Sequence, residues 1–332
     1  MIKELYNKLE ISLLKEDNSF KDYDRNHIFF EILNYCSTKT TEAEKMDMYY
    51  HFYSYQRIIE QGRNRKLKLA DFWINRVKSV PLNHQSKEST EGMNSLLYPA
   101  IAFASYMKKD YEDALVQLEK TFACIDFLIE DGFKEGILMK IEQKLNEFRT
   151  LYNMKNDNAL NVLTSTLNYI VSDTVSKDFV IPISEVSKTK NEEIGLFNYC
   201  FDSIFLKVYR NKEFMQSFEN DFFLKLIENL PASYSSNFSF LHEPMEAFLA
   251  ILRGNDQKFF ERILQSNLLD DRLPGMMRFT FIATIVNHLK KTEVDVTPLH
   301  NAFRKYNRVN LKAPDIFASE LLKNKQNEKQ LA

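Results

Sequence analysis

Glycine and proline are scarce in this sequence, with only 7 Gly and 8 Pro among 332 residues. Folds built from strands and tight turns need many such residues, because Gly supplies positive φ angles and Pro interrupts regular structure. Their scarcity argues against a turn-rich β fold. Long runs of Leu, Phe, Lys and Glu are typical of helices instead, so we expect an all-α chain.

Cysteine is rarer still. Cys36, Cys124 and Cys200 are odd in number, lie far apart and form no Cys-x-x-Cys pair. This spacing argues against a disulfide framework or a structural zinc site and favours a reducing, cytoplasmic location. The 44 basic and 46 acidic residues nearly cancel, leaving a net charge of −2. The overall charge therefore gives no reason to expect nucleic acid as a partner.

Long apolar runs are also missing. No stretch reaches the roughly 18 apolar residues of a membrane-spanning helix, so we expect no membrane association. Residues 1–20 lack the continuous apolar core and the cleavage site of a signal peptide, and their pattern is that of an amphipathic helix. Frequent Lys, Asn, Ile and Phe residues suggest a bacterial source with an AT-rich genome.

The sequence contains none of four common catalytic or nucleotide-binding motifs, namely H-E-x-x-H, G-x-x-x-x-G-K-S/T, G-x-G-x-x-G and G-x-S-x-G. The nearest approach to a metal site is the pair His242 and Glu246, one helical turn apart. Pro244 between them indicates a helix start, where an acidic side chain is expected for reasons of charge. We therefore expect a protein that is not an enzyme, with no catalytic residue, no metal and no cofactor.

What the sequence does contain is helical periodicity along most of its length, since apolar residues recur every three to four positions. The pattern predicts about fourteen helices joined mostly by short loops, which is typical of antiparallel hairpins stacked in series. The expected helices span residues 2–16, 25–36, 41–60, 65–79, 93–108, 111–130, 134–152, 157–171, 191–210, 212–229, 243–253, 256–266, 274–289, 298–306 and 314–323.

Residues 173–189 interrupt this helical pattern. They are rich in Ser, Thr and Val and contain Pro182, which are features of a boundary between folded regions. We predict a linker or crossing segment here, with room for one short strand. It separates an N-terminal helical-hairpin region, residues 1–172, from a C-terminal helical-hairpin region, residues 190–332.

The strongest local pattern lies in residues 98–121, which read as two amphipathic helices around a tight turn. Small side chains at Ala102 and Ala114 let the two helix axes approach closely. The segment resembles a tetratricopeptide repeat, a helix–turn–helix unit of about 34 residues. The matching positions are Tyr98, Ile101, Ala102, Tyr111, Ala114 and Leu118.

The resemblance is limited to one clear unit. Ser105 and Thr121 stand where the family has Tyr and Ala, and Phe259 replaces the family's Ala in a second, weaker segment near Gly254. The resemblance implies a tetratricopeptide-like α-solenoid, built as one body or in two halves. It also implies that the chain binds a protein or peptide without catalysing a reaction. An irregular all-α domain with one fortuitous match is the alternative.

Two sets of residues are candidates for partner binding. In tetratricopeptide units the first helix lines the concave face, which would place Phe103, Tyr106 and Met107 there. The second set is a basic cluster around a turn between two predicted helices, whose charge suits an acidic partner. Its members are Arg63, Arg65, Lys66 and Lys68. A solvated turn without a partner is the alternative for this cluster.

Other functions use the same kind of scaffold. Residues 248–289 resemble an α-helical family of bacterial toxin-immunity proteins, in which a short helix pair with a Gly-Asp-like turn precedes a buried apolar helix. That resemblance implies a protein that binds and neutralises a cognate toxin. A peptide-responsive regulator or an accessory subunit is a further possibility. An all-α enzyme would need converging carboxylates or histidines, which the sequence does not indicate.

Overall fold

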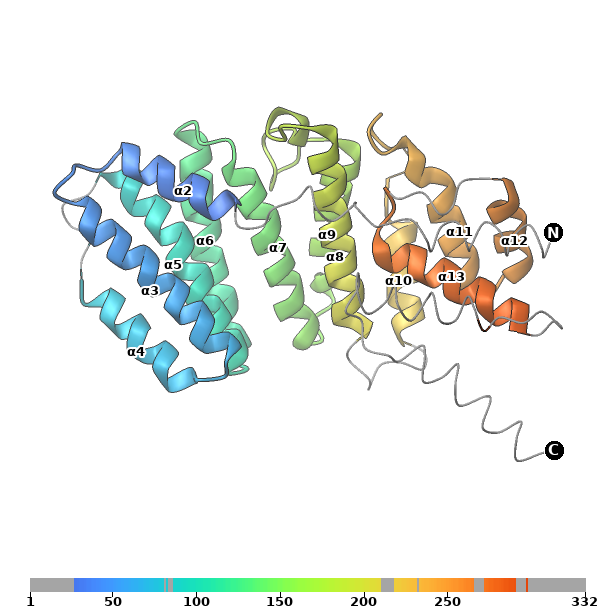
Figure 1. Cartoon of the computed structure of the whole chain (residues 1–332), viewed down its shortest axis with the longest axis horizontal. Coiled ribbons are helices and arrows are strands. Elements are labelled where there is room, and N and C mark those ends of the chain that lie inside the picture. The colour runs from blue at the N-terminus through green and yellow to red at the C-terminus, as the bar shows by residue number, and fades with distance from the viewer. Residues whose placement is uncertain are drawn as a thin grey trace. The chain divides into compact units, whose positions relative to one another are not determined.

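The structure is a computed structural model that describes residues 27–80, 82, 86–209, 218–231, 233–265, 272–290 and 297. These residues form twelve α-helices and two short 3-10 helices and contain no strand, which confirms the all-α prediction. The α-helices, labelled as in Figure 1, are α2 (His27–Thr38), α3 (Lys45–Arg63), α4 (Leu67–Lys78), α5 (Lys87–Met107), α6 (Tyr111–Glu130), α7 (Gly136–Asn153), α8 (Asn158–Ser172), α9 (Lys190–Tyr209), α10 (Phe218–Glu228), α11 (His242–Leu252), α12 (Asp256–Gln265) and α13 (Gly275–Lys290). The 3-10 helices are η1 (Ile183–Glu185) and η3 (Ser239–Leu241).

Most predicted helix ends agree with the observed bounds to within a few residues. The main difference is α5, which begins at Lys87, six residues before the predicted start. Ser86 caps this end, because its side chain accepts a hydrogen bond from the Ser89 backbone N–H at 3.1 Å. The helices expected at 2–16, 298–306 and 314–323 lie outside the described residues, and so does the beginning of the helix expected at 212–229.

Helices pack against their sequential neighbours, as expected for stacked hairpins. Contacts join α3 to α4, α5 to α6 and α6 to α7, and further along they join α10 to α11 and α11 to α12. Helix α5 also packs against α2 and α3, so it lies at the centre of the group formed by α2, α3, α4 and α6 (Figure 1). Its side chains Ala100 and Ala104 are fully buried, which allows close helix contacts on more than one side.

One turn geometry recurs after α3, α5 and α7, and it also ends α6 and α11, where Gly132 and Gly254 take the left-handed position. Arg65, Lys109 and Lys155 adopt left-handed backbone conformations, with φ of 56°, 66° and 57°. After each of them the next backbone N–H donates to a carbonyl five residues earlier, at 2.9–3.0 Å. This is the Schellman arrangement that ends helices. The three residues are separated by 44 positions (65 to 109) and 46 positions (109 to 155).

A buried alanine follows each of the turns after α3, α5 and α7, at Ala70, Ala114 and Ala159. In the α3–α4 and α5–α6 pairs, which are in contact, the buried alanine early in the second helix permits close packing. The spacing is longer than the 34 residues of a tetratricopeptide repeat. The likeness of residues 98–121 to a tetratricopeptide repeat is therefore limited to the turn and the small residues beside it. The spacing between successive turns differs from the repeat length of that family.

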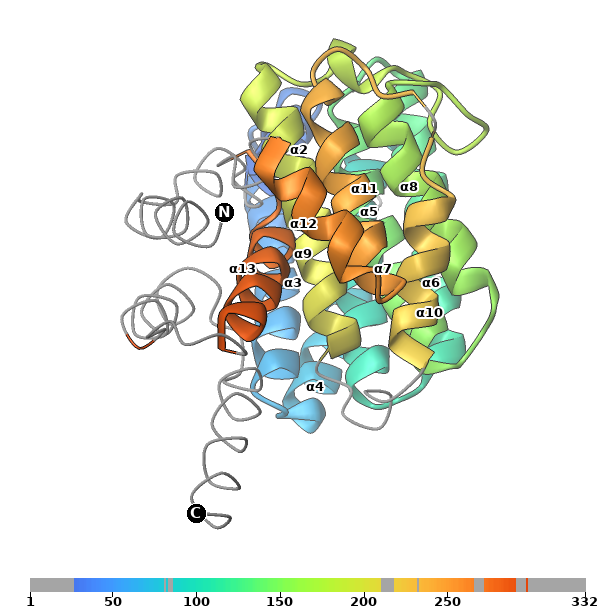
Figure 2. The same ribbon diagram turned by 90° about the vertical axis from the view of Figure 1, so that its right-hand side faces the viewer.

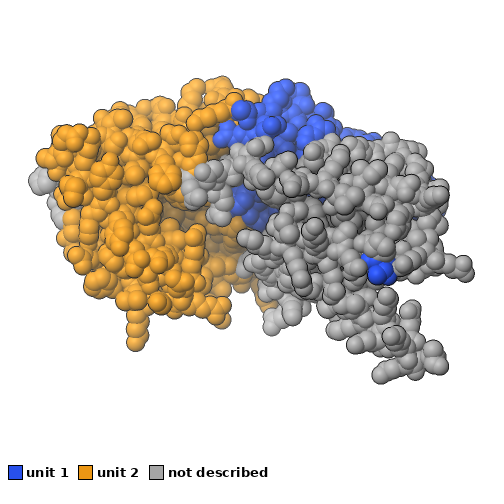
Figure 3. All heavy atoms as spheres, in the orientation of Figure 1, with its two compact units in different colours: residues 1–23, 170–172, 189–332 blue, residues 24–169, 173–188 orange. Residues whose placement is uncertain are grey.

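The chain divides into two compact units (Figure 3). Residues 24–169 and 173–188 form one, which is orange and marked unit 2 in Figure 3 and is here called the first unit because it comes first along the described chain. The other, marked unit 1 in Figure 3 and here called the second unit, contains residues 170–172 together with the described residues from 189 onward. Part of the predicted linker, 173–189, is folded against α8. The Tyr169 ring stacks on Phe179 at 4.2 Å, and its hydroxyl donates to the Ile181 carbonyl at 2.7 Å. Whether the two regions behave as separate domains stays a prediction.

The second unit is built around α11, which contacts α10, α12, α13 and η3 (Figure 2). Aromatic rings from different helices fill its core, with Phe248 lying close to Phe201 and Phe281. The buried Asp202 carboxylate accepts hydrogen bonds from the Gly275 and Met276 backbone N–H groups at 3.0 and 2.9 Å. These N–H groups open α13 and have no intrahelical partner, so the carboxylate caps the helix and its own charge is compensated.

Candidate binding site

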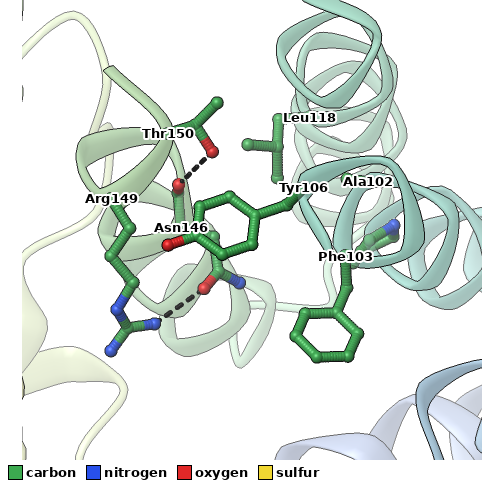
Figure 4. A pocket seen from close by; sticks show the side chains of 8 residues that line it. Ala102, Phe103, Tyr106, Leu118, Asn146, Arg149 and Thr150 are labelled. Atoms are coloured by element: carbon green, nitrogen blue, oxygen red, sulfur yellow. Dashed lines mark hydrogen bonds between the residues drawn. The ribbon is translucent and has the colours of Figure 1, made fainter. Parts of the chain in front are cut away.

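A pocket of about 110 Å³ lies where α5, α6 and α7 meet in the first unit. Helix α5 supplies an apolar side, α6 one leucine, and α7 three polar side chains. The lining residues are Pro99, Ala102, Phe103, Tyr106, Leu118, Asn146, Arg149 and Thr150. Figure 4 shows the Tyr106 ring lying between the polar residues of α7 and Leu118.

The floor of this pocket is apolar and rigid. Ala102 and Leu118 are almost completely buried, because they belong to the close contact between α5 and α6. Tyr106 is half-buried, and its hydroxyl accepts a hydrogen bond from Asn153 Nδ2 at 2.8 Å. This bond fixes the ring against α7. Pro99 stands inside α5, where proline removes one backbone hydrogen bond.

The polar side of the pocket comes from α7. Arg149 Nη1 donates to Asn146 Oδ1 at 2.7 Å, and Thr150 Oγ1 donates to the Asn146 carbonyl at 2.8 Å (Figure 4). A guanidinium has five N–H donors, and the bond to Asn146 occupies one of them. None of the ion pairs formed by the described residues involves Arg149. A positively charged donor group thus lies at the rim of an apolar cavity.

The size of the pocket limits what it can hold. Pockets for small molecules and cofactors usually measure about 300–1,000 Å³. At about 110 Å³, this one has room for a single apolar side chain. Its shape and lining fit the insertion of one residue from a partner better than the binding of a cofactor.

Two of the three predicted concave residues, Phe103 and Tyr106, line the pocket, and Met107 does not. Phe103 also reaches α3, where a Cβ atom built on Gly62 would lie 2.9 Å from the ring. A larger residue at position 62 would therefore require the Phe103 ring to shift. This contact places Phe103 beside the C-terminal end of α3, next to Arg63.

The basic cluster lies at the α3–α4 turn. All four predicted members, Arg63, Arg65, Lys66 and Lys68, are exposed. In the described part of the chain none of them takes part in an ion pair, and the nearby Asp71 pairs with Lys108 of α5 instead. Their charge is thus available to a partner, and their role in binding stays a prediction.

The residues from α7 are absent from the sequence-based site. Asn146, Arg149 and Asn153 form a polar stripe along α7, at spacings of three and four residues. This polar stripe is the signal in the sequence that would have pointed to these residues. It has meaning only once α7 is known to lie beside α5 and α6.

A metal site or a reactive cysteine would be another source of chemistry in the described residues. They contain no group of three or more His, Cys, Asp or Glu residues positioned to hold a metal ion. Of the pair His242 and Glu246, the nearest approach to a metal site in the sequence, Glu246 forms an ion pair with Lys258 at 3.5 Å. Burial raises the pKa of the Cys36 thiol to about 12 and also raises the pKa of Cys124, so both remain protonated and poorly nucleophilic at neutral pH.

Within the described helices, none combines the length and the apolar character needed to cross a bilayer. Comparison of the chain with protein-family models, with curated proteins and with solved structures gives no match.

Proposed function

We propose that this chain is a non-catalytic, tetratricopeptide-like scaffold that binds a protein or peptide along α5 and α7. The observation that carries the proposal is the side-chain-sized apolar pocket with Tyr106 and Arg149 at its rim. A partner would insert one apolar residue beside Tyr106 and present a carboxylate to Arg149. A cytoplasmic location belongs to the same proposal.

The chemistry of the rim supports this choice. Tyr and Arg are enriched among the residues that dominate binding energy at protein interfaces. Arginine also recognises carboxylates through paired hydrogen bonds. Asn146 orients the Arg149 guanidinium before binding, so less conformational entropy is lost when a partner arrives. An acidic partner suits both Arg149 and the exposed basic cluster at the α3–α4 turn.

A bacterial immunity protein is the second candidate, supported by the order of elements in the second unit. The short helices α11 and α12 are joined by a turn in which Gly254 has φ of 67°. Helix α13 follows, with Met277, Phe281 and Ile285 buried. This order matches the resemblance noted at residues 248–289. In that case the bound partner would be a toxin, and a toxin gene beside this one would be expected.

The test is recovery of a partner from a native lysate of the source organism, using the full chain as bait. We expect a stoichiometric partner with the unmodified chain and its loss with Arg149→Glu or Tyr106→Ser. Lys177→Glu is a charge-matched control, because Lys177 is exposed and lies outside the pocket. No stoichiometric partner under gentle conditions, or equal recovery by Arg149→Glu, would contradict the proposal. Circular dichroism would verify that the variants remain folded.

A further inference from the structure

Exposed aromatic side chains gather on the outer face of the α3–α4 hairpin. Among the described residues, five of the nine large hydrophobic side chains that are strongly exposed lie between positions 46 and 72. The exposed fractions are 48% for Tyr49, 50% for Tyr53, 48% for Leu69 and 51% for Phe72. Together with Trp73 and Arg76, these four residues are called the hairpin face. Contiguous apolar surface of this kind usually marks an interaction site.

The rings of the hairpin face are fixed by contacts with one another. Trp73 meets Tyr53 at 5.8 Å and Phe72 at 5.7 Å, with interplanar angles of 82° and 80°. The Arg76 guanidinium lies within 6.0 Å of the centroids of Tyr50, Phe72 and Trp73. The surface is therefore organised before any partner binds, which lowers the entropic cost of association.

Basic residues outnumber acidic ones around the α3–α4 turn and along α4. Residues 57–78 contain seven Lys or Arg residues and two acidic ones, although the whole chain has a net charge of −2. Both acidic residues are already used, since Glu60 pairs with Arg57 and Asp71 pairs with Lys108. An approaching molecule thus meets apolar ring edges with an excess of positive charge on the side of α4 and the α3–α4 turn.

We propose that the hairpin face docks an acidic amphipathic segment of another protein. Apolar side chains of that segment would pack on the exposed edges of Tyr53 and Phe72. Its carboxylates would lie against Arg76 and the basic residues of the α3–α4 turn, in line with electrostatic complementarity at interfaces. None of the hairpin-face residues lines the pocket between α5 and α7, although the basic residues of the α3–α4 turn could serve either surface. The inference holds whether or not that pocket binds a partner.

The observations favour this occupant over three others. Single-stranded nucleic acid stacks on open ring faces. Here the rings meet edge to face, and the Arg76 guanidinium lies over two rings of the hairpin face, Phe72 and Trp73. A second copy of the same face would bring like charges together. Residues 291–332 of this chain contain more Lys and Arg than Asp and Glu, so they do not supply an acidic segment.

The chain contains a reporter for the test, because Trp73 is its single Trp. Trp73 fluorescence of the full chain would be followed while three probes are added separately at low salt. The probes are a synthetic amphipathic peptide of Leu and Glu at helical spacing, the same peptide with Lys in place of Glu, and a single-stranded oligonucleotide. We expect a saturable change with the acidic peptide alone, weakened by added salt because the charges are exposed.

Two variants and two controls make the result specific. Phe72→Ser and Arg76→Ser should each weaken binding of the acidic peptide by about tenfold, which corresponds to about 1.4 kcal/mol. Val116→Ser removes an equally exposed hydrophobic side chain from α6 (47% exposed) and should have no effect. Arg149→Glu alters the other site and should also leave the titration unchanged, so failure here is distinguishable from failure of the pocket.

Several outcomes would overturn the inference. These are the absence of a fluorescence change with the acidic peptide, tighter binding of the oligonucleotide, or unchanged binding by folded Phe72→Ser and Arg76→Ser. A concentration-dependent Trp73 signal without any probe would also contradict it, because this would indicate that a second copy occupies the face.

Discussion

Replacing Gly92 with alanine tests a close contact between α2 and α5. A Cβ atom at position 92 would lie 2.3 Å from Cys36 Sγ, far inside the roughly 3.5–4.0 Å at which buried heavy atoms make favourable contact. The next nearest atoms, from Ile32 and Leu128, are at an ordinary 3.9 Å. The cysteine sulfur is therefore the one atom that excludes alanine.

Two opposing effects set the size of the change. Alanine is favoured over glycine inside a helix by about 1 kcal/mol. Overpacking of a tight core costs about 1–3 kcal/mol, and a separation this short belongs at the upper end of that range. We expect Gly92→Ala to lower the free energy of unfolding by about 1–2 kcal/mol.

The same substitution should have the opposite sign once the sulfur is removed. Cys36→Ala alone should cost about 1 kcal/mol through lost packing. In that background the Cβ atom at position 92 enters the vacated space, so Gly92→Ala should stabilise the chain by about 1 kcal/mol. The coupling energy of the double-mutant cycle would then be about 2–3 kcal/mol.

Urea unfolding followed by Trp73 fluorescence is the appropriate assay, because Trp73 belongs to the same unit as Gly92 and Cys36. Unfolding free energies come from linear extrapolation, and equal slopes verify that the variants unfold comparably. A Gly92→Ala variant that is more stable than the unmodified chain would refute the reasoning, and so would an equal change in both backgrounds.

Three further predictions concern stability. Ala114→Arg should lower the free energy of unfolding by about 3 kcal/mol or more, because a long charged side chain cannot fit at a fully buried helix contact. The control Val116→Arg, on the exposed side of α6, should change the free energy of unfolding by less than about 0.5 kcal/mol. Burial lowers the pKa of His51, so below the unfolded value of about 6.5 the unfolded chain binds more protons than the folded chain. The free energy of unfolding should therefore decrease as the pH is lowered, by at most about 1.4 kcal/mol per pH unit. Denaturant midpoints at pH 7.5 and 5.5 should differ less for His51→Gln than for the unmodified chain. Gly254→Ala should cost about 1 kcal/mol in thermal unfolding through backbone strain alone, because φ is 67° and no atom lies within 4 Å of the added Cβ; an unchanged melting temperature would show that this turn relaxes freely.

The helices were largely predictable because their signals are local. Helix α6 begins at the predicted residue, since the Asp110 side chain accepts a hydrogen bond from the Asp113 N–H at 3.2 Å. The early start of α5 was missed because its first residues, 87–92, are polar and have no apolar periodicity. Pro99 also suggests a helix break, and only the packing of α5 on α2, α3 and α6 explains why the helix continues.

The candidate site was predictable only in part, because it is assembled from separate helices. Phe103 and Tyr106 were identified through the position of α5 in a helical hairpin. Arg149 could not be assigned to the same site, since its place beside Tyr106 depends on how α7 crosses α6. The contact between Phe103 and Gly62 likewise joins residues 41 positions apart (62 to 103), and neither helix alone indicates it.

The recurring turn at Arg65, Lys109 and Lys155 has a consequence for how such a chain can evolve. Each 44–46 residue segment contains its own helix stop and its own close-packing alanine, so the instructions for folding it are carried inside the segment. Gene duplication of one segment would add a hairpin without redesign of its neighbours. Lengthening the scaffold and altering the residues it presents are thus separable evolutionary steps.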